Sequence, residues 1–229
     1  MVSSNVPQPA RTLSTVCLSS ILLDTLINPL TVHTSGTSVL NDNANGEYKS
    51  DKIYYDDKPE DIEALPDDAP HRQIDLTIIR TRKELGAKAK IAIMIPPEIY
   101  GYNPAHKRLT IQLRAITRFA LKHGFAGHVG KGLSVWSQIH VLDLARAYVV
   151  LLHWMEKASP EEVLENPYFF CESGKEFSWK EAAEVIGKAL YKAGKIKSPE
   201  PRTIPEELYG DIFVSETGFE VCVVFLTGV

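Results

Sequence analysis

The chain has 229 residues, of which 44% are apolar and 24% are charged, a composition that excludes a disordered chain, a collagen and a coiled coil. The net charge of −4 disfavours a protein that binds the phosphates of nucleic acid. Three widely separated cysteines cannot form a disulfide framework, and no apolar run reaches the roughly 18–20 residues of a membrane span, so a cytoplasmic protein that binds no membrane is expected.

The first 68 residues combine a loose start, one short strand and an acidic loop. Residues 1–29 are expected to be a loose segment that includes a helix at Leu13–Ile27, where leucines recur every four residues. A short β-leaning run follows at Leu30–His33. Residues 51–68 hold eight acidic residues and several prolines, which predicts a surface loop with one short helix.

A helix and a buried strand come next. The apolar spacing over His71–Leu85 predicts an amphipathic helix that ends at Gly86, with Ile74 on its buried stripe and Arg82 facing water. Lys90–Ile95 is short and rich in isoleucine, which indicates a buried strand. A strand, a helix and a second strand predict a parallel βαβ unit, so α/β is the expected fold class.

The second half of the chain contains three predicted helices. Residues 125–132 contain regularly spaced glycines and predict a hairpin-like turn. Asp143 is a candidate N-cap for the helix that follows it. Ser159 and Ser178 each begin a capping box. The seven histidines lack partners at metal-ligand spacing, so no metal site is expected. The expected elements are helices at Lys107–Lys122, at Leu144–Lys157 and from Ser178 to about Ala193, and a strand at Tyr168–Cys171.

Residues with chemical potential follow the ends of the predicted strands. The first strand ends in Thr34-Ser35-Gly36, and a Tyr-x-x-x-Lys pattern, Tyr48 to Lys52, begins fourteen residues after Thr34. The later strand ends in Pro-Pro-Glu-Ile-Tyr-Gly at residues 96–101, and Ile-His-Val-Leu-Asp-Leu-Ala stands at residues 139–145. A tyrosine can take a proton from an alcohol only if its pKa falls from about 10, and a nearby lysine supplies the charge that lowers it.

Together these segments resemble the extended short-chain dehydrogenases/reductases of the NAD-dependent epimerase/dehydratase type. The resemblance implies an incomplete Rossmann-like, doubly wound parallel sheet with a small C-terminal substrate lobe. It divides the chain into the loose segment and helix 1–29, the C-terminal half of a Rossmann-like domain at 30–123, and a mixed segment at 124–229 that holds the substrate lobe and returning sheet elements. It further implies NAD or NADP as cofactor, a small carbonyl or alcohol as substrate, and a homodimer.

The resemblance also implies roles for seven residues. In this family a hydroxyl orients the substrate oxygen, a tyrosine–lysine pair transfers the proton, and residues after a proline-ended strand approach the nicotinamide. The residues implied are Thr34 and Ser35 for orientation, Tyr48 and Lys52 for proton transfer, and Pro96, Pro97 and Ile99 for cofactor contact.

The position of the tyrosine departs from the family pattern. In the family it opens the helix before the proline-ended strand, but the corresponding helix here has no tyrosine, and His71 and Asp75 stand in the equivalent positions. Two interpretations stay open. Either Tyr48 and Lys52 have taken over proton transfer from a new position, or Tyr48 is a surface aromatic and the site is divergent or inert.

The glycine-rich phosphate loop is a second departure. No such loop follows a strand near the N-terminus, and the glycines between 124 and 132 stand too late in the chain. With the abruptly apolar end at residues 221–229, this favours a truncated gene product. The expected function is an NAD(P)-binding epimerase/dehydratase-like oxidoreductase fragment. The alternatives are a non-catalytic module that senses a dinucleotide or binds a protein, and an inactive truncated product.

Overall fold

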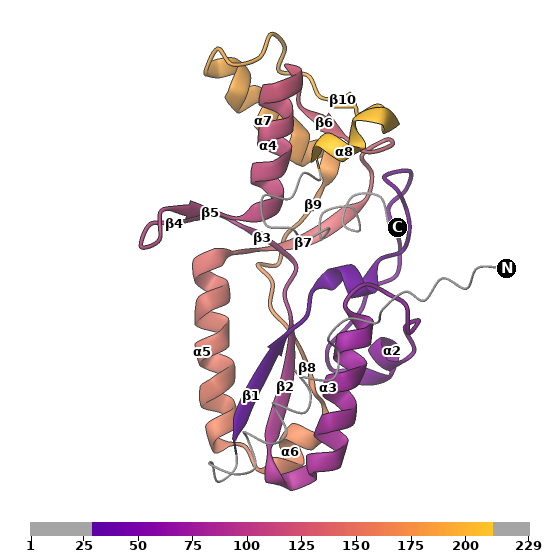
Figure 1. Ribbon diagram of the computed structural model, residues 1–229, viewed down its shortest axis with the longest axis vertical. Coiled ribbons are helices and arrows are strands. Elements are labelled where there is room, and N and C mark those ends of the chain that lie inside the picture. The colour runs from indigo at the N-terminus through magenta and orange to yellow at the C-terminus, as the bar shows by residue number, and fades with distance from the viewer. Residues whose placement is uncertain (1–28, 213–229) are drawn as a thin grey trace, which may run out of the picture.

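The structure is a computed structural model that describes residues 29–212 (Figure 1). A parallel sheet of three strands forms the centre of its lower part in this view. The strands are β1 (Leu30–Thr34), β2 (Lys90–Ile95) and β8 (Tyr168–Phe170), in the order β1-β2-β8 and all parallel. The helix expected at residues 13–27 and the apolar end at 221–229 lie outside the described residues.

Helices cover both faces of this sheet, which confirms the α/β class. Helix α3 (Arg72–Leu85) connects β1 to β2 and lies on one face, and α5 (Val141–Lys157) lies on the other (Figure 1). Alternate residues of β2 point to opposite faces, as the twofold period of a strand requires. The cores are Ile79, Ile93, Ile95 and Tyr168 on the α3 side, and Ala92, Met94, Leu151 and Met155 on the α5 side.

The predicted helix at 71–85 is confirmed, but two of its side chains face the other way. Arg82, expected in water, is buried and its guanidinium donates a 2.6 Å hydrogen bond to the carbonyl of Val163 in α6 (Pro160–Glu165). Ile74, expected on the buried stripe, is 58% exposed. The apolar stripe alone did not reveal that α6 offers a carbonyl acceptor to a long cationic side chain, and this contact makes burial of Arg82 possible.

A second sheet, with helices beside it, forms the upper part of the molecule in Figure 1. Strands β3 (Glu98–Tyr100), β7 (Val135–His140) and β9 (Glu176–Ser178) lie in the order β3-β7-β9. Other elements of the structure are α2 (Pro59–Glu63), α4 (Ile111–His123), α7 (Trp179–Lys192), α8 (Tyr209–Ile212), and the short strands β4 (Tyr102–Asn103), β5 (Arg108–Leu109), β6 (Gly127–His128) and β10 (Arg202–Thr203), with 3-10 turns at Thr37–Leu40, Gly86–Lys88 and Glu206–Leu208.

Three local predictions in this part are wrong. Helix α4 begins four residues later than expected because β5 first pairs with β4. Residues 125–132 form no hairpin, since β6 pairs in parallel with the distant strand β10. The N-cap of α5 is His140, whose Nδ1 accepts from the backbone N–H of Leu142 at 3.3 Å, and Asp143 lies within the first turn.

Other local signals are confirmed. The capping boxes at Ser159 and Ser178 both form, each with a glutamate at the third helical position. Gly86 ends α3 with φ 52°, a conformation that glycine adopts without strain. Within residues 29–212, no helix is both long and apolar enough to cross a membrane.

Candidate functional site

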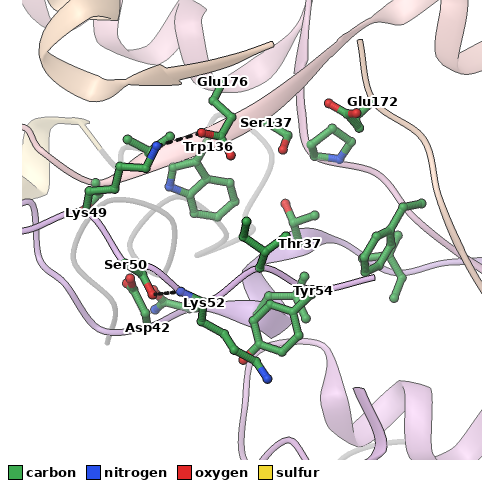
Figure 2. A pocket seen from close by; sticks show the side chains of 18 of the residues that line it. Thr37, Asp42, Lys49, Ser50, Lys52, Tyr54, Trp136, Ser137, Glu172 and Glu176 are labelled. Carbon is green, nitrogen blue, oxygen red and sulfur yellow. Dashed lines mark hydrogen bonds and ion pairs between the residues drawn. The ribbon is translucent and has the colours of Figure 1, made fainter. Parts of the chain in front are cut away.

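A groove of about 1180 Å³ lies at the carboxyl ends of β1 and β2. Thr37, Ile95 and Pro97 line it from the parallel-sheet side, Trp136 lines it from β7, and residues 49–56 line a further wall. Figure 2 shows this pocket with the side chains gathered around it. The carboxyl ends of parallel strands are where ligands bind in open α/β sheets, so this groove is the candidate binding site.

The charge of the groove is predominantly negative. Both lining lysines already have acidic partners: Lys49 lies 3.0 Å from Glu176, and Lys52 lies 3.2 Å from Asp61. Among the described residues, no arginine lines the groove. Five carboxylates line it, Asp42, Asp51, Asp56, Glu172 and Glu176. Binding an anionic ligand here is therefore electrostatically unfavourable.

Four aromatic residues belong to the lining, Tyr54, Tyr55, Trp136 and Phe170. Trp136 and Tyr54 lie on different sides of the groove in Figure 2. Their rings offer broad apolar contact area at little cost in conformational entropy. The sequence prediction did not include them, because they come from a strand and a loop some 80 positions apart and no short-range spacing links them.

A polar cluster adjoins the groove at the end of β1. The hydroxyl of Ser35 donates a 2.7 Å hydrogen bond to one oxygen of Asp75, and Nε2 of His33 lies 3.1 Å from the other. Ser35 and Asp75 are buried, whereas His33 is partly exposed. The cluster is close to the groove along the chain, because Ser35 lies two residues before Thr37, which lines the groove.

His71 completes this cluster. Its ring packs against Gly36, where an added Cβ would lie 3.2 Å from Nε2 of His71. Burial lowers the pKa of the His71 imidazole, Asp75 opposes the shift, and His33 adds to it. The sequence places His71 and Asp75 at the start of the helix, but the approach of this helix to Ser35 spans about 40 residues and follows only from the tertiary structure.

The side chains of Thr34 and Ser35 point in opposite directions. Successive residues of a strand point to opposite faces, so Ser35 reaches Asp75 of α3, while the Thr34 hydroxyl lies 2.6 Å from the Tyr148 hydroxyl of α5. Thr34 and Ser35 thus lie on opposite sides of the sheet, and only Ser35 belongs to the polar cluster.

Tyr48 and Lys52 have different partners. The Tyr48 hydroxyl donates to the backbone carbonyl of Asp42 at 3.0 Å, and 49% of Tyr48 is exposed. Lys52 lines the groove, pairs with Asp61 and lies over the ring of Tyr54. Their joint role in proton transfer stays a prediction.

The three residues expected beside a nicotinamide lie along the chain that leaves β2. Pro97 lines the groove, and the carbonyl of Pro96 accepts the backbone N–H of Thr37 at 3.1 Å, which ties the end of β2 to the end of β1. Ile99 lies in β3 opposite Ile139 of β7. Of the three, Pro97 is the residue placed at the groove.

The glycine-spaced segment does not fit a dinucleotide. A Cβ added to Gly127 would lie 2.3 Å from Ile204, and one added to Gly130 would lie 2.5 Å from the carbonyl of Asn45. Protein atoms therefore fill the space beside these glycines, and the described residues supply no glycine cradle for a pyrophosphate there. In the described part of the chain no group of three or more histidine, cysteine or acidic residues could hold a metal ion.

Comparison with known proteins identifies the fold. No protein-family profile matches the chain, and no curated protein sequence matches it. An epimerase, Mth375 of Methanothermobacter thermautotrophicus, has a TM-score of 0.55 at 12% identity and is matched over 94% of this chain and 62% of its own. UDP-glucuronic acid 4-epimerase of Bacillus cereus, solved with UDP-glucuronic acid and NAD, has a TM-score of 0.51 at 15% identity. The match covers 93% of this chain and 64% of the epimerase.

A third structure agrees with these two. The dTDP-glucose 4,6-dehydratase of Bacillus anthracis, solved with NAD, has a TM-score of 0.50 at 16% identity, over 93% of this chain and 63% of its own. The chain thus spans somewhat less than two thirds of each of these structures. At such identities the likeness concerns the fold, and it confirms that the chain has the Rossmann-like α/β fold of epimerases and dehydratases that the sequence motifs implied.

Proposed function

We propose that the chain forms the substrate-binding part of an epimerase/dehydratase-like oxidoreductase that acts on a small, uncharged carbonyl or alcohol compound. The observation that carries this proposal is the groove at the carboxyl ends of β1 and β2, in a fold shared with epimerases and dehydratases. Ser35 supplies a hydroxyl beside the groove, and its bond to Asp75 holds that hydroxyl in one orientation.

The charge of the groove supports an uncharged substrate. The epimerase of Bacillus cereus was solved with a nucleoside-diphosphate sugar, whose phosphates are anionic. Phosphates are bound by arginine, by lysine and by helix N-termini. Here the two lining lysines are paired with carboxylates, and acidic side chains outnumber them. Trp136 and Tyr54 instead favour a neutral ligand with an apolar face.

A dinucleotide cofactor belongs to the proposed activity, but the described residues supply only its substrate side. Pro97 is the residue at the groove that we propose to approach a nicotinamide. No described residue is assigned to the pyrophosphate. The resemblance does not distinguish NAD from NADP, and a cytoplasmic location and a homodimer stay predictions.

The purified full-length chain tests this proposal. Thermal shifts are measured with a panel of neutral aliphatic and aromatic aldehydes and ketones, and with UDP-glucose as the anionic comparison. Oxidation of NADH and NADPH is followed with the same panel. We expect stabilisation by neutral carbonyl compounds, little by UDP-glucose, and cofactor oxidation with those that bind.

Two variants make the test specific to the groove. Trp136→Ala removes a ring from the lining and is expected to weaken carbonyl binding at least about tenfold, corresponding to about 1.4 kcal/mol. Tyr191→Ala, at a half-exposed position of α7 outside the groove, is the control and is expected to bind like the wild type. Preferential binding of UDP-glucose, or an absence of turnover with every carbonyl, contradicts the proposal, and dinucleotide binding without turnover favours the non-catalytic module.

A further inference from the structure

The backbone of His71 adopts a conformation that its residue type disfavours. Its φ is 64° and its ψ is −24°, in the left-handed region. The N–H of Arg72 donates to the carbonyl of Ala69 at 3.0 Å, so Pro70 and His71 are the central residues of a turn. A positive φ at the second central position is typical of a type II turn, which favours glycine or asparagine there. Histidine at this position adds strain, and strained residues of this kind cluster at functional sites, where the surrounding structure holds them.

The side chain of His71 contributes no cap to the helix that it precedes. His71 is the N-cap of α3, but no side-chain hydrogen bond caps this helix end. An asparagine would adopt this left-handed conformation with less strain. The imidazole is therefore a poor choice for local stability and points to a chemical role.

The surroundings of the imidazole suit a proton acceptor. The titratable groups that face it are Asp75 of α3 and His33 of β1, and burial is the largest influence on its pKa, which is lowered. The ring is consequently neutral near pH 7 and able to take up a proton. Asp75 is already held by Ser35 and His33, so its carboxylate is fixed where it attracts the imidazolium that results.

We propose that His71 is the catalytic proton acceptor of this site, and that it deprotonates a hydroxyl group of the substrate beside Ser35. The O–H bond of the substrate breaks, the proton forms an N–H bond with the imidazole, and the electron pair stays on the substrate oxygen. Asp75 is a positioning residue that holds Ser35 and stabilises the imidazolium. The inference deepens the proposed function and rests on it for the identity of the substrate.

Acylation by diethyl pyrocarbonate tests the inference without turnover. This reagent modifies neutral imidazoles, and peptide mass mapping of the full-length chain reports each histidine separately. We expect His71 to be acylated with an apparent pKa below the ordinary value of 6.5 for histidine. An unreactive His71, or an apparent pKa of 6.5 or above, overturns the proposal.

Substitution provides the second test. His71→Asn is expected to raise the melting temperature by about 3 °C, because it relieves the strained turn. The same variant is expected to oxidise alcohols with NAD or NADP about 100-fold more slowly than the wild type, or worse. His71→Gly also fits the turn, and added imidazole is expected to restore part of its activity. His153→Asn, the control, is expected to keep the wild-type activity.

The outcomes separate this inference from the proposed function. If the wild type turns over no carbonyl compound, the proposed function fails, and the acylation and stability results still decide whether His71 is a strained, neutral proton acceptor. A melting temperature that falls in His71→Asn, or an activity that survives in it, shows that the side chain of His71 is structural and overturns the inference.

Discussion

Replacing Glu98 by glutamine is expected to stabilise the protein, and increasingly so as the pH rises. Glu98 lies in β3 opposite Gln138 and is 1% exposed. Neither of its carboxyl oxygens has a hydrogen-bond partner among residues 29–212. Burial raises the pKa of Glu98 from an ordinary value of 4.5 to about 8. The folded protein therefore holds a proton that the unfolded chain releases.

The sign and size of the effect follow from this difference. Below pH 4.5 Glu98 is protonated in both the folded and the unfolded state, so it does not lower the free energy of unfolding. Between pH 4.5 and about 8 the free energy of unfolding falls by about 1.4 kcal/mol per pH unit. Above about pH 8 the carboxyl group is ionised in both states, and the free energy of unfolding falls no further on its account. Glutamine has the same shape and does not ionise. Glu98→Gln should thus gain about 1 kcal/mol near pH 5, about 3 near pH 7 and about 4 near pH 8.

Urea unfolding at these three pH values measures the gain. Glu84→Gln, an exposed carboxylate on α3, is the control and should change stability by less than about 0.5 kcal/mol throughout. A gain for Glu98→Gln that stays constant with pH, or a loss at every pH, would refute the reasoning, because it would mean that Glu98 has partners that stabilise its charged form.

Three further predictions concern stability and use the same unfolding assay. Lys90→Met should cost about 2–3 kcal/mol, because the buried ammonium donates to two carbonyls at the end of α5, whereas Lys88→Met at an exposed position should be neutral. Ser178→Ala should cost about 1 kcal/mol and Ser178→Asp should retain most of that stability, since aspartate also caps α7; equal losses would contradict the capping role. Gly101→Ala should cost at least about 2 kcal/mol, because φ is 112° and the new Cβ would lie 2.3 Å from Nε2 of His140; an unaffected variant would show that this approach relaxes freely.

Local signals in the sequence predicted many of the elements. The apolar spacing of α3, the short isoleucine-rich strand β2 and both capping boxes concern residues within a few positions of one another, so their physics is contained in short segments. The parallel pairing of β1 with β2 followed from the helix between them, because a parallel connection needs such a crossover. The motifs at the strand ends pointed to the fold that the solved structures confirm.

Contacts between distant segments were decided by the tertiary structure. The pairing of β6 with β10 and the burial of Arg82 depend on partners more than 70 residues away. No local sequence pattern therefore predicts them. The same holds for the groove, where Trp136 and Tyr54 face one space from separate elements.

The candidate site shows this division most clearly. By itself, the sequence determined that hydroxyl, imidazole and carboxylate groups follow the end of β1 and begin α3. Only the folded chain decided that Ser35, His33 and His71 converge on Asp75, because the turn before α3 and the end of β1 meet at one edge of the sheet. The strained backbone of His71 is likewise a tertiary property, since a turn that favours glycine or asparagine persists with histidine only where the surrounding structure holds it.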